Sequence, residues 1–159
     1  MFKRRGRILF LDPGSGVRAR MAEAWAAALG GEWVAPEAAA LRPGPVPAQV
    51  AAVMAEAGVA VASGACPAWA GGHGGDRDLV VPLELGTGED WAAILDGARA
   101  KRWDLAGVCP GDGATPEPDA LRVCRDALKE RVSGLLGGFR MKAREADQRQ
   151  PGPQNGRQG

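Results

Sequence analysis

Residues 8–23 read Ile8-Leu9-Phe10-Leu11-Asp12-Pro13-Gly14-Ser15-Gly16-Val17-Arg18-Ala19-Arg20-Met21-Ala22-Glu23. The apolar beginning is typical of a buried strand, the middle of a glycine-containing loop, and the end of a helix. Such a loop directs its backbone amides toward one point and ends at a helix N-terminus, where peptide dipoles favour negative charge. The run therefore predicts an anion-binding loop. Its donors would be Gly14, Ser15, Gly16, Val17 and Arg18.

Strand-like and helix-like segments alternate along the rest of the chain. After the first strand, we expect strands at 33–35, 79–81 and 101–103. Pro82 is expected to limit the strand at 79–81. Helices are expected at 17–29, 48–58, from residue 91 onward, and at 119–136. Strands that alternate with helices form parallel sheets covered on both faces. The pattern predicts a three-layer α/β/α domain with a central four-stranded parallel sheet, and residues 12–18 at the carboxyl end of its first strand.

The length of 159 residues fits one domain. We divide the chain into an N-terminal extension (1–6), the α/β domain (7–140) and a C-terminal tail (141–159). Gln, Pro, Gly and Asn dominate from about residue 146, so the tail is expected to be disordered.

Composition excludes several classes of partner. The formal net charge is +1, and Lys and Arg are spread along the chain, which argues against a nucleic-acid surface. Charges or glycines interrupt every apolar run before it reaches the length of a membrane span. The apolar run after the basic N-terminus is only as long as a strand, too short for a signal peptide. We expect a cytoplasmic protein that binds neither nucleic acid nor membrane.

The three cysteines, Cys66, Cys109 and Cys124, are widely spaced and form no Cys-x-x-Cys pair. With His73 as the single histidine, a zinc site is not expected, and we expect neither a metal nor a cofactor. The cysteines are interpreted as buried or incidental thiols. A redox role for Cys109 is the alternative. His73 lies among glycines and is interpreted as a solvated loop residue, with a catalytic base as the alternative.

Two further features give the loop a family resemblance. Arg18 follows Asp12 by six residues, and Met-Ala-Glu follows at 21–23. The run resembles the phosphate loop of the low-molecular-weight protein tyrosine phosphatase and arsenate reductase superfamily, in which a cysteine begins the loop and an arginine ends it. Weaker similarities extend over about 7–139. The resemblance implies the α/β/α fold of that superfamily.

The chain departs from the family at several positions that carry the chemistry. Asp12 replaces the nucleophilic cysteine, Ala19 the serine that supports the thiolate, and Ser15 the asparagine that braces the loop. Gly107-Val108 stands in place of the Asp-Pro general acid. Asp112, further along, could substitute only if its loop were remodelled. Segment 82–91 lacks the additional cysteines of thioredoxin-coupled reductases. Concurrent loss of nucleophile and acid indicates loss of the reaction.

Asp12 has two possible roles in such a loop. As a nucleophile, its carboxylate would repel an incoming anion by about 4 kcal/mol at 4 Å and an effective dielectric near 20. As a substitute for the anion, it would accept loop N–H bonds and pair with Arg18. We favour the second role. Arg18 is accordingly interpreted as the ion-pair partner of Asp12, with direct anion binding as its alternative.

The sequence therefore predicts a non-catalytic relative of the phosphatases and arsenate reductases that acts as a binding or regulatory protein. Its partner would be a protein or a small oxyanion. The alternative is an active phosphatase or arsenate reductase with altered, thiol-independent chemistry.

Overall fold

The computed structural model describes residues 5–70, 73–113 and 116–149. Four parallel strands form the sheet: β1 (Gly6–Asp12), β2 (Val34–Ala40), β3 (Leu79–Glu84) and β4 (Trp103–Asp104). The helices are α1 (Val17–Gly30), α2 (Ala48–Glu56), α3 (Trp91–Leu95) and α4 (Pro118–Arg149), with short 3-10 turns at Gly31–Trp33 and His73–Asp76. The strand order is β2-β1-β3-β4. The predicted four-stranded parallel sheet is confirmed.

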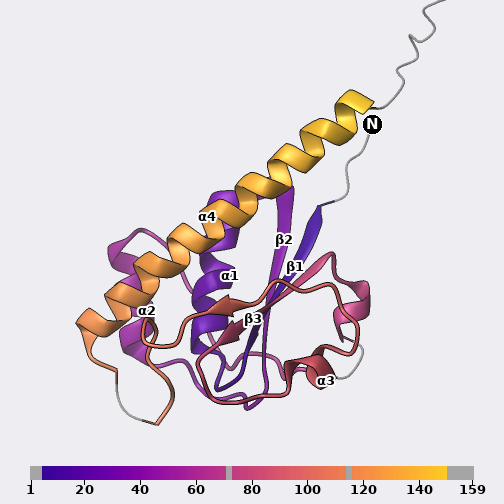
Figure 1. The fold of residues 1–159 in the computed structure, drawn as a ribbon. Coiled ribbons are helices and arrows are strands. Elements are labelled where there is room, and N and C mark those ends of the chain that lie inside the picture. Colours follow the sequence, from indigo (N-terminus) through magenta and orange to yellow (C-terminus); the bar gives the residue numbers. More distant parts are fainter. Residues whose placement is uncertain (1–4, 71–72, 114–115, 150–159) are drawn as a thin grey trace, which may run out of the picture.

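The sheet lies between two layers of helices (Figure 1). Successive side chains of β1 point to opposite faces. Ile8 and Phe10 pack in the larger core cluster with α1, α2 and α4, whereas Leu9 and Leu11 pack in a smaller cluster with Trp91 of α3. This alternation explains why β1 is apolar from Ile8 to Leu11, since both of its faces are covered.

Two strands run further than the sequence indicates, and each contains a proline. The prediction for the second strand, 33–35, was too short, because β2 pairs with β1 from Val34 to Ala40. Since β2 is an edge strand, Pro36 is tolerated there.

The prediction that Pro82 limits the third strand was wrong. The Val80 amide points toward Arg99, and Pro82, two residues on, faces the same side. On that side pairing is interrupted between the bridge at Ala100 and the start of β4 at Trp103, so the missing N–H of Pro82 leaves no ladder bond unmade.

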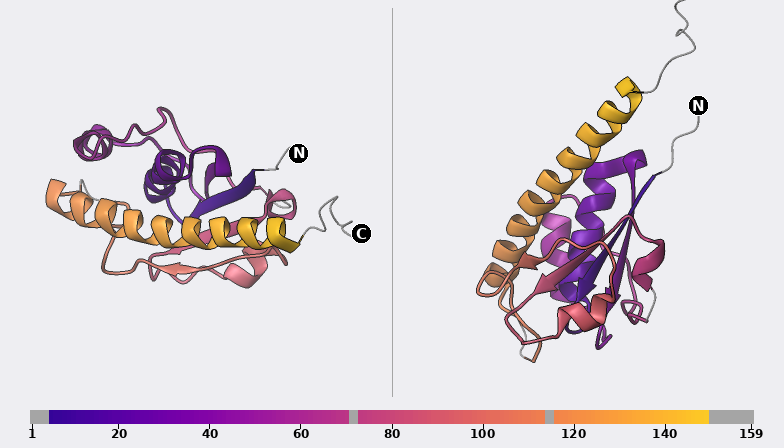
Figure 2. Two further views of the ribbon diagram at one scale, coloured as in Figure 1. Left: turned by 90° about the horizontal axis from the view of Figure 1, so that it is seen from above. Right: turned by 45° about the vertical axis from the view of Figure 1, so that its right-hand side comes forward.

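Helix α4 is longer than expected. Its predicted core positions are all buried: Leu121, Cys124, Leu128, Val132 and Leu135. The predicted end near residue 136 was wrong, since the helix continues to Arg149 and its last turns extend beyond the sheet (Figure 2). Residues 140–149 contain neither Pro nor Gly and are rich in helix-forming Arg, Lys, Ala and Glu, which favours continuation. The boundary proposed at residue 140 falls inside α4, and residues 150–159 lie outside the described residues.

Candidate functional site: a closed anion loop

Residues 12–18, called the anion loop from here on, connect β1 to α1 at the carboxyl end of β1. The segment after β2 binds the outer side of this loop. Its amides at Leu41, Arg42 and Gly44 donate to the carbonyls of Asp12, Gly14 and Ser15 at 2.9, 3.0 and 3.1 Å. Because these carbonyls are bound from outside, the loop amides are free to point inward. The predicted position of the loop is confirmed.

The loop turns into α1 through a glycine that no other residue could replace without strain. Gly16 has φ of 107°, in the left-handed region. A Cβ there would lie 2.4 Å from Cβ of Cys66, so both the backbone angle and the space require glycine.

The Asp12 carboxylate occupies the inside of the loop. Its Oδ1 accepts from the Gly14 amide at 2.8 Å, and its Oδ2 accepts from the amides of Arg18 and Ala19 at 3.0 and 3.2 Å. The carboxylate is fully buried. It therefore satisfies the first amides of α1 as an anion would, and places its charge at the positive end of the helix dipole. The prediction that Asp12 accepts loop amides is confirmed.

Arg18 lies beside this carboxylate and is 2% exposed. Its Nη2 donates to Asp12 Oδ1 at 2.6 Å, and its Nη1 donates to Asp112 Oδ1 at 3.0 Å and to the Pro110 carbonyl at 3.2 Å. Burial alone would lower the pKa of the guanidinium, but the two carboxylates offset it and the pKa is raised. Arg18 is thus a charged ion-pair partner of Asp12, as predicted.

Asp112 is the residue that sequence reasoning undervalued. Its carboxylate accepts from the Ser15 amide at 2.8 Å, from Ser15 Oγ at 2.7 Å and from Arg18. Its contact with Gly14 is so close that a Cβ at that glycine would lie 1.9 Å from Oδ2. Burial alone would raise the pKa of Asp112, but hydrogen bonds from Arg18 and Ser15 lower it. The carboxylate is therefore ionised at neutral pH and closes the mouth of the loop.

Two of the cysteines are joined, which corrects their interpretation as incidental thiols. Cys109 and Cys124 form a disulfide, with their Cα atoms 4.6 Å apart. Cys66 is free and buried beneath the loop, and burial raises the pKa of its thiol to about 11. The sequence contained one signal for this disulfide, the positions of the two cysteines. Cys109 precedes the Asp112 segment, and Cys124 lies in the second turn of the helix that follows it.

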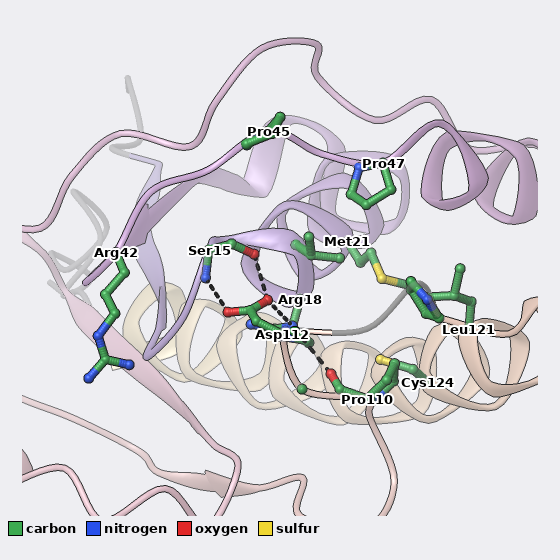
Figure 3. Close-up of a pocket in the computed structure, with 14 residues that line it drawn as sticks. Ser15, Arg18, Met21, Arg42, Pro45, Pro47, Pro110, Asp112, Leu121 and Cys124 are labelled. Atoms are coloured by element: carbon green, nitrogen blue, oxygen red, sulfur yellow. Dashed lines mark hydrogen bonds and ion pairs between the residues drawn. The ribbon is translucent and has the colours of Figure 1, made fainter.

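A pocket of about 360 Å³ lies beside the closed loop, and Figure 3 shows the residues around it. Val17, Met21 and Leu121 give it an apolar wall, while Pro45 and Pro47 line the side formed by the segment after β2. Ser15, Arg18 and Asp112 supply its polar side. His73 begins a 3-10 turn, and its side chain lies outside what the structure describes.

Two comparisons gave no match: no protein-family model and no curated protein is similar to the chain. Solved structures do resemble it. An arsenate reductase in its phosphate-binding state superposes with a TM-score of 0.71 at 22% identity, over 84% of this chain and 98% of that one. The tyrosine phosphatase AmsI of Erwinia amylovora gives 0.69 at 18% identity, over 85% and 93%. A YwlE mutant from Bacillus subtilis gives 0.67 at 19% identity, over 85% and 99%.

These similarities cover most of the chain and show its fold. None of the helices in the described part of the chain combines the length and apolar character that a membrane crossing requires. The chain therefore has the α/β fold of the low-molecular-weight tyrosine phosphatases and arsenate reductases, with an aspartate at the start of its anion loop.

Proposed function

We propose that this protein is a non-catalytic relative of the phosphatases and arsenate reductases whose fold it has, and that it acts as a binding or regulatory protein. The observation that carries the proposal is the Asp12 carboxylate, which accepts three amides and the Arg18 guanidinium inside the loop. The anion position is filled by the protein itself. An oxyanion substrate would have to displace a buried, fully hydrogen-bonded carboxylate before it could reach these donors.

The reacting groups that the chemistry needs are also missing. Thiolate attack requires a cysteine of depressed pKa at the centre of the loop. Cys66 is buried with a raised pKa, and Cys109 and Cys124 are bonded to each other. Asp12 as a nucleophile would meet an incoming anion at the electrostatic cost of like charges, about 4 kcal/mol at 4 Å and an effective dielectric near 20.

One observation favours the alternative, an active phosphatase or reductase with thiol-independent chemistry. Asp112 reaches the mouth of the loop, where a proton donor could serve a leaving group. A general acid must be protonated at working pH, and the lowered pKa of Asp112 opposes this. We therefore keep the non-catalytic function as the conclusion.

The open pocket beside the loop is the place we assign to the partner. Its apolar wall and proline-lined side suit a protein segment, and Ser15 and Arg18 on its polar side suit a small oxyanion or an acidic group on that segment. The proposed location is the cytoplasm, with neither nucleic acid nor membrane as a partner.

The test is turnover by purified protein. We expect no hydrolysis of p-nitrophenyl phosphate and no thioredoxin-coupled arsenate reduction above buffer, both for the wild type and for Asp12→Ala. A phosphatase of the same fold serves as the positive control for the assay. Turnover that persists through purification and disappears in Asp12→Ala would refute the proposal. If Asp12→Ala fails to fold, Asp12→Asn, which keeps the side-chain shape, replaces it.

A further inference from the structure

The segment 109–113, called the cover from here on, lies over the mouth of the anion loop and is joined covalently to α4 by the Cys109–Cys124 disulfide. We propose that this disulfide is a redox latch: it holds the cover closed over the loop, and its reduction by a dithiol releases the cover and exposes Ser15 and Arg18. The inference goes beyond the proposed function, since a cover would control access to a binding loop and to a reacting loop alike.

Four polar contacts join the cover to the loop. Asp112 accepts from the backbone and hydroxyl of Ser15 and from Nη1 of Arg18, and the Pro110 carbonyl accepts from the same Nη1. The Asp112 side chain is 42% exposed, and Arg18 already has a buried partner in Asp12. Ion pairs that reach solvent contribute little by themselves. These contacts can therefore open and close without disturbing the core.

The glycines of the cover give it little packing of its own. A Cβ at Gly111 or Gly113 would meet no atom within 4 Å among the described residues, and Gly113 has φ of 108°. Glycine on both sides of Asp112 leaves the backbone free to move once a restraint is lost. The restraint is the disulfide, three residues before Asp112, which keeps the carboxylate at a high effective concentration near the loop.

Opening the latch needs a named reductant. An external dithiol attacks one sulfur, the S–S bond breaks, and a mixed disulfide forms with one protein cysteine. The second thiol of the reductant then resolves it. In sum the protein disulfide gains two electrons and two protons to become two thiols, and the dithiol becomes a disulfide. Cys109 is 7% exposed and Cys124 is fully buried. The dithiol therefore attacks the Cys109 sulfur, and Cys124 leaves as the thiolate.

The compartment proposed above fits a bond of this kind. Disulfides of cytosolic proteins are seldom permanent, because thioredoxin and glutathione keep thiols reduced, and those that form are typically transient and redox-sensing. On this account the oxidised protein has a covered loop and the reduced protein an open one.

Hydrogen exchange with mass spectrometry tests the latch directly, using the full chain with and without dithiothreitol. Reduction should increase exchange of the Ser15 amide, which donates to Asp112, by about tenfold, as expected for loss of a local restraint. The double variant Cys109→Ala/Cys124→Ala should show the fast exchange without reductant. Cys66→Ala is the matched control: it removes the third thiol and should keep both the slow exchange and the response to reductant. Equal exchange in the two redox states, or absence of the disulfide in the air-oxidised protein, would overturn the proposal.

Sulfate titration by calorimetry tests the consequence for the loop. Reduction should raise sulfate affinity about tenfold, within the usual range of coupling between two sites. Asp112→Ala should bind sulfate with the higher affinity in both redox states, because the disulfide then holds a cover without its carboxylate. The matched control is Glu130→Ala, an exposed carboxylate on α4. A sulfate affinity that does not change on reduction would overturn the latch. The turnover assay tests the proposed function separately.

Discussion

Asp12 and Arg18 form an ion pair of 2.6 Å in which both side chains are almost completely buried, six residues apart in one loop. Neither group is exposed to water, so removal of one would leave the buried charge of the other without a partner. Asp12 also accepts three backbone amides, and Arg18 also donates to Asp112 and to the Pro110 carbonyl. Substitution of either residue therefore leaves several buried polar groups to be compensated.

Asp12→Ala should lower the free energy of unfolding by about 3–5 kcal/mol, the usual cost of leaving a buried charge without its partner. The vacated amides and Arg18 should then bind sulfate more tightly than the parent does. Urea denaturation with and without sulfate measures both effects, since a ligand of the native state stabilises it. Asp126→Ala, which removes one member of an exposed ion pair with Arg125, is the control and should cost no more than about 1 kcal/mol. Equal or weaker sulfate binding by Asp12→Ala would show that Asp12 does not occupy the anion position.

The hydrogen bonds that Asp112 accepts should weaken at acid pH. Its pKa is lowered in the folded protein from the ordinary value of 3.8, so the stability that it contributes is present above that value and lost as pH falls through the folded pKa. The Ser15 amide resonance, followed by NMR from pH 6 downward, should therefore shift only below about 4. In Asp112→Asn the shift should be absent. A midpoint above 4 in the wild type would contradict the lowered pKa.

Cys66 should be unreactive in the native protein. Burial raises the pKa of its thiol to about 11, so almost no thiolate exists at pH 8. We expect no labelling by iodoacetamide at that pH without denaturant and complete labelling in guanidinium chloride, with mass spectrometry as the readout. Because the folded pKa is the higher one, the stability linked to the protonated thiol is present below the ordinary value of 9.0 and lost as pH rises toward 11. Rapid native labelling would show that the packing around Gly16 and Cys66 opens.

Gly16→Ala should destabilise the fold more than a glycine substitution that strains only the backbone. Gly58 is the matched site: its φ is 77°, and a Cβ there would meet no atom of the described residues within 4 Å. Alanine at Gly58 should cost about 1–2 kcal/mol. At Gly16 the collision with Cys66 adds an overpacking cost of about 1–3 kcal/mol. Chemical denaturation of both variants gives the difference. Equal losses would mean that the loop moves away from Cys66 at little cost.

The four-stranded parallel sheet and its layers were predictable because the signals were local. The apolar run of β1, the glycines of the loop and the helical spacing of α4 each act within a few residues. The Asp12 contacts could also be predicted, since the loop, the helix start and the carboxylate lie in one continuous run.

What could not be predicted depends on segments far apart in the sequence. Ser15 and Asp112 are separated by 97 residues, and nothing near either residue specifies that they meet. The seven-residue length of β2 follows from its pairing with β1, which overrides the weak strand preference of alanine at 38–40. The tolerance of Pro82 depends on a gap in pairing with the neighbouring strand.

The hydrogen bonds that Leu41, Arg42 and Gly44 donate to the loop carbonyls also affect the thermodynamics of any ligand exchange. Because the backbone is held from outside, the loop is ordered whichever anion lies within it. The entropy cost of ordering the loop is therefore part of folding and not part of anion binding. Exchange of the internal carboxylate for an external oxyanion should therefore proceed with little change in heat capacity. Its enthalpy would come from the anions and their hydration and not from refolding of the backbone.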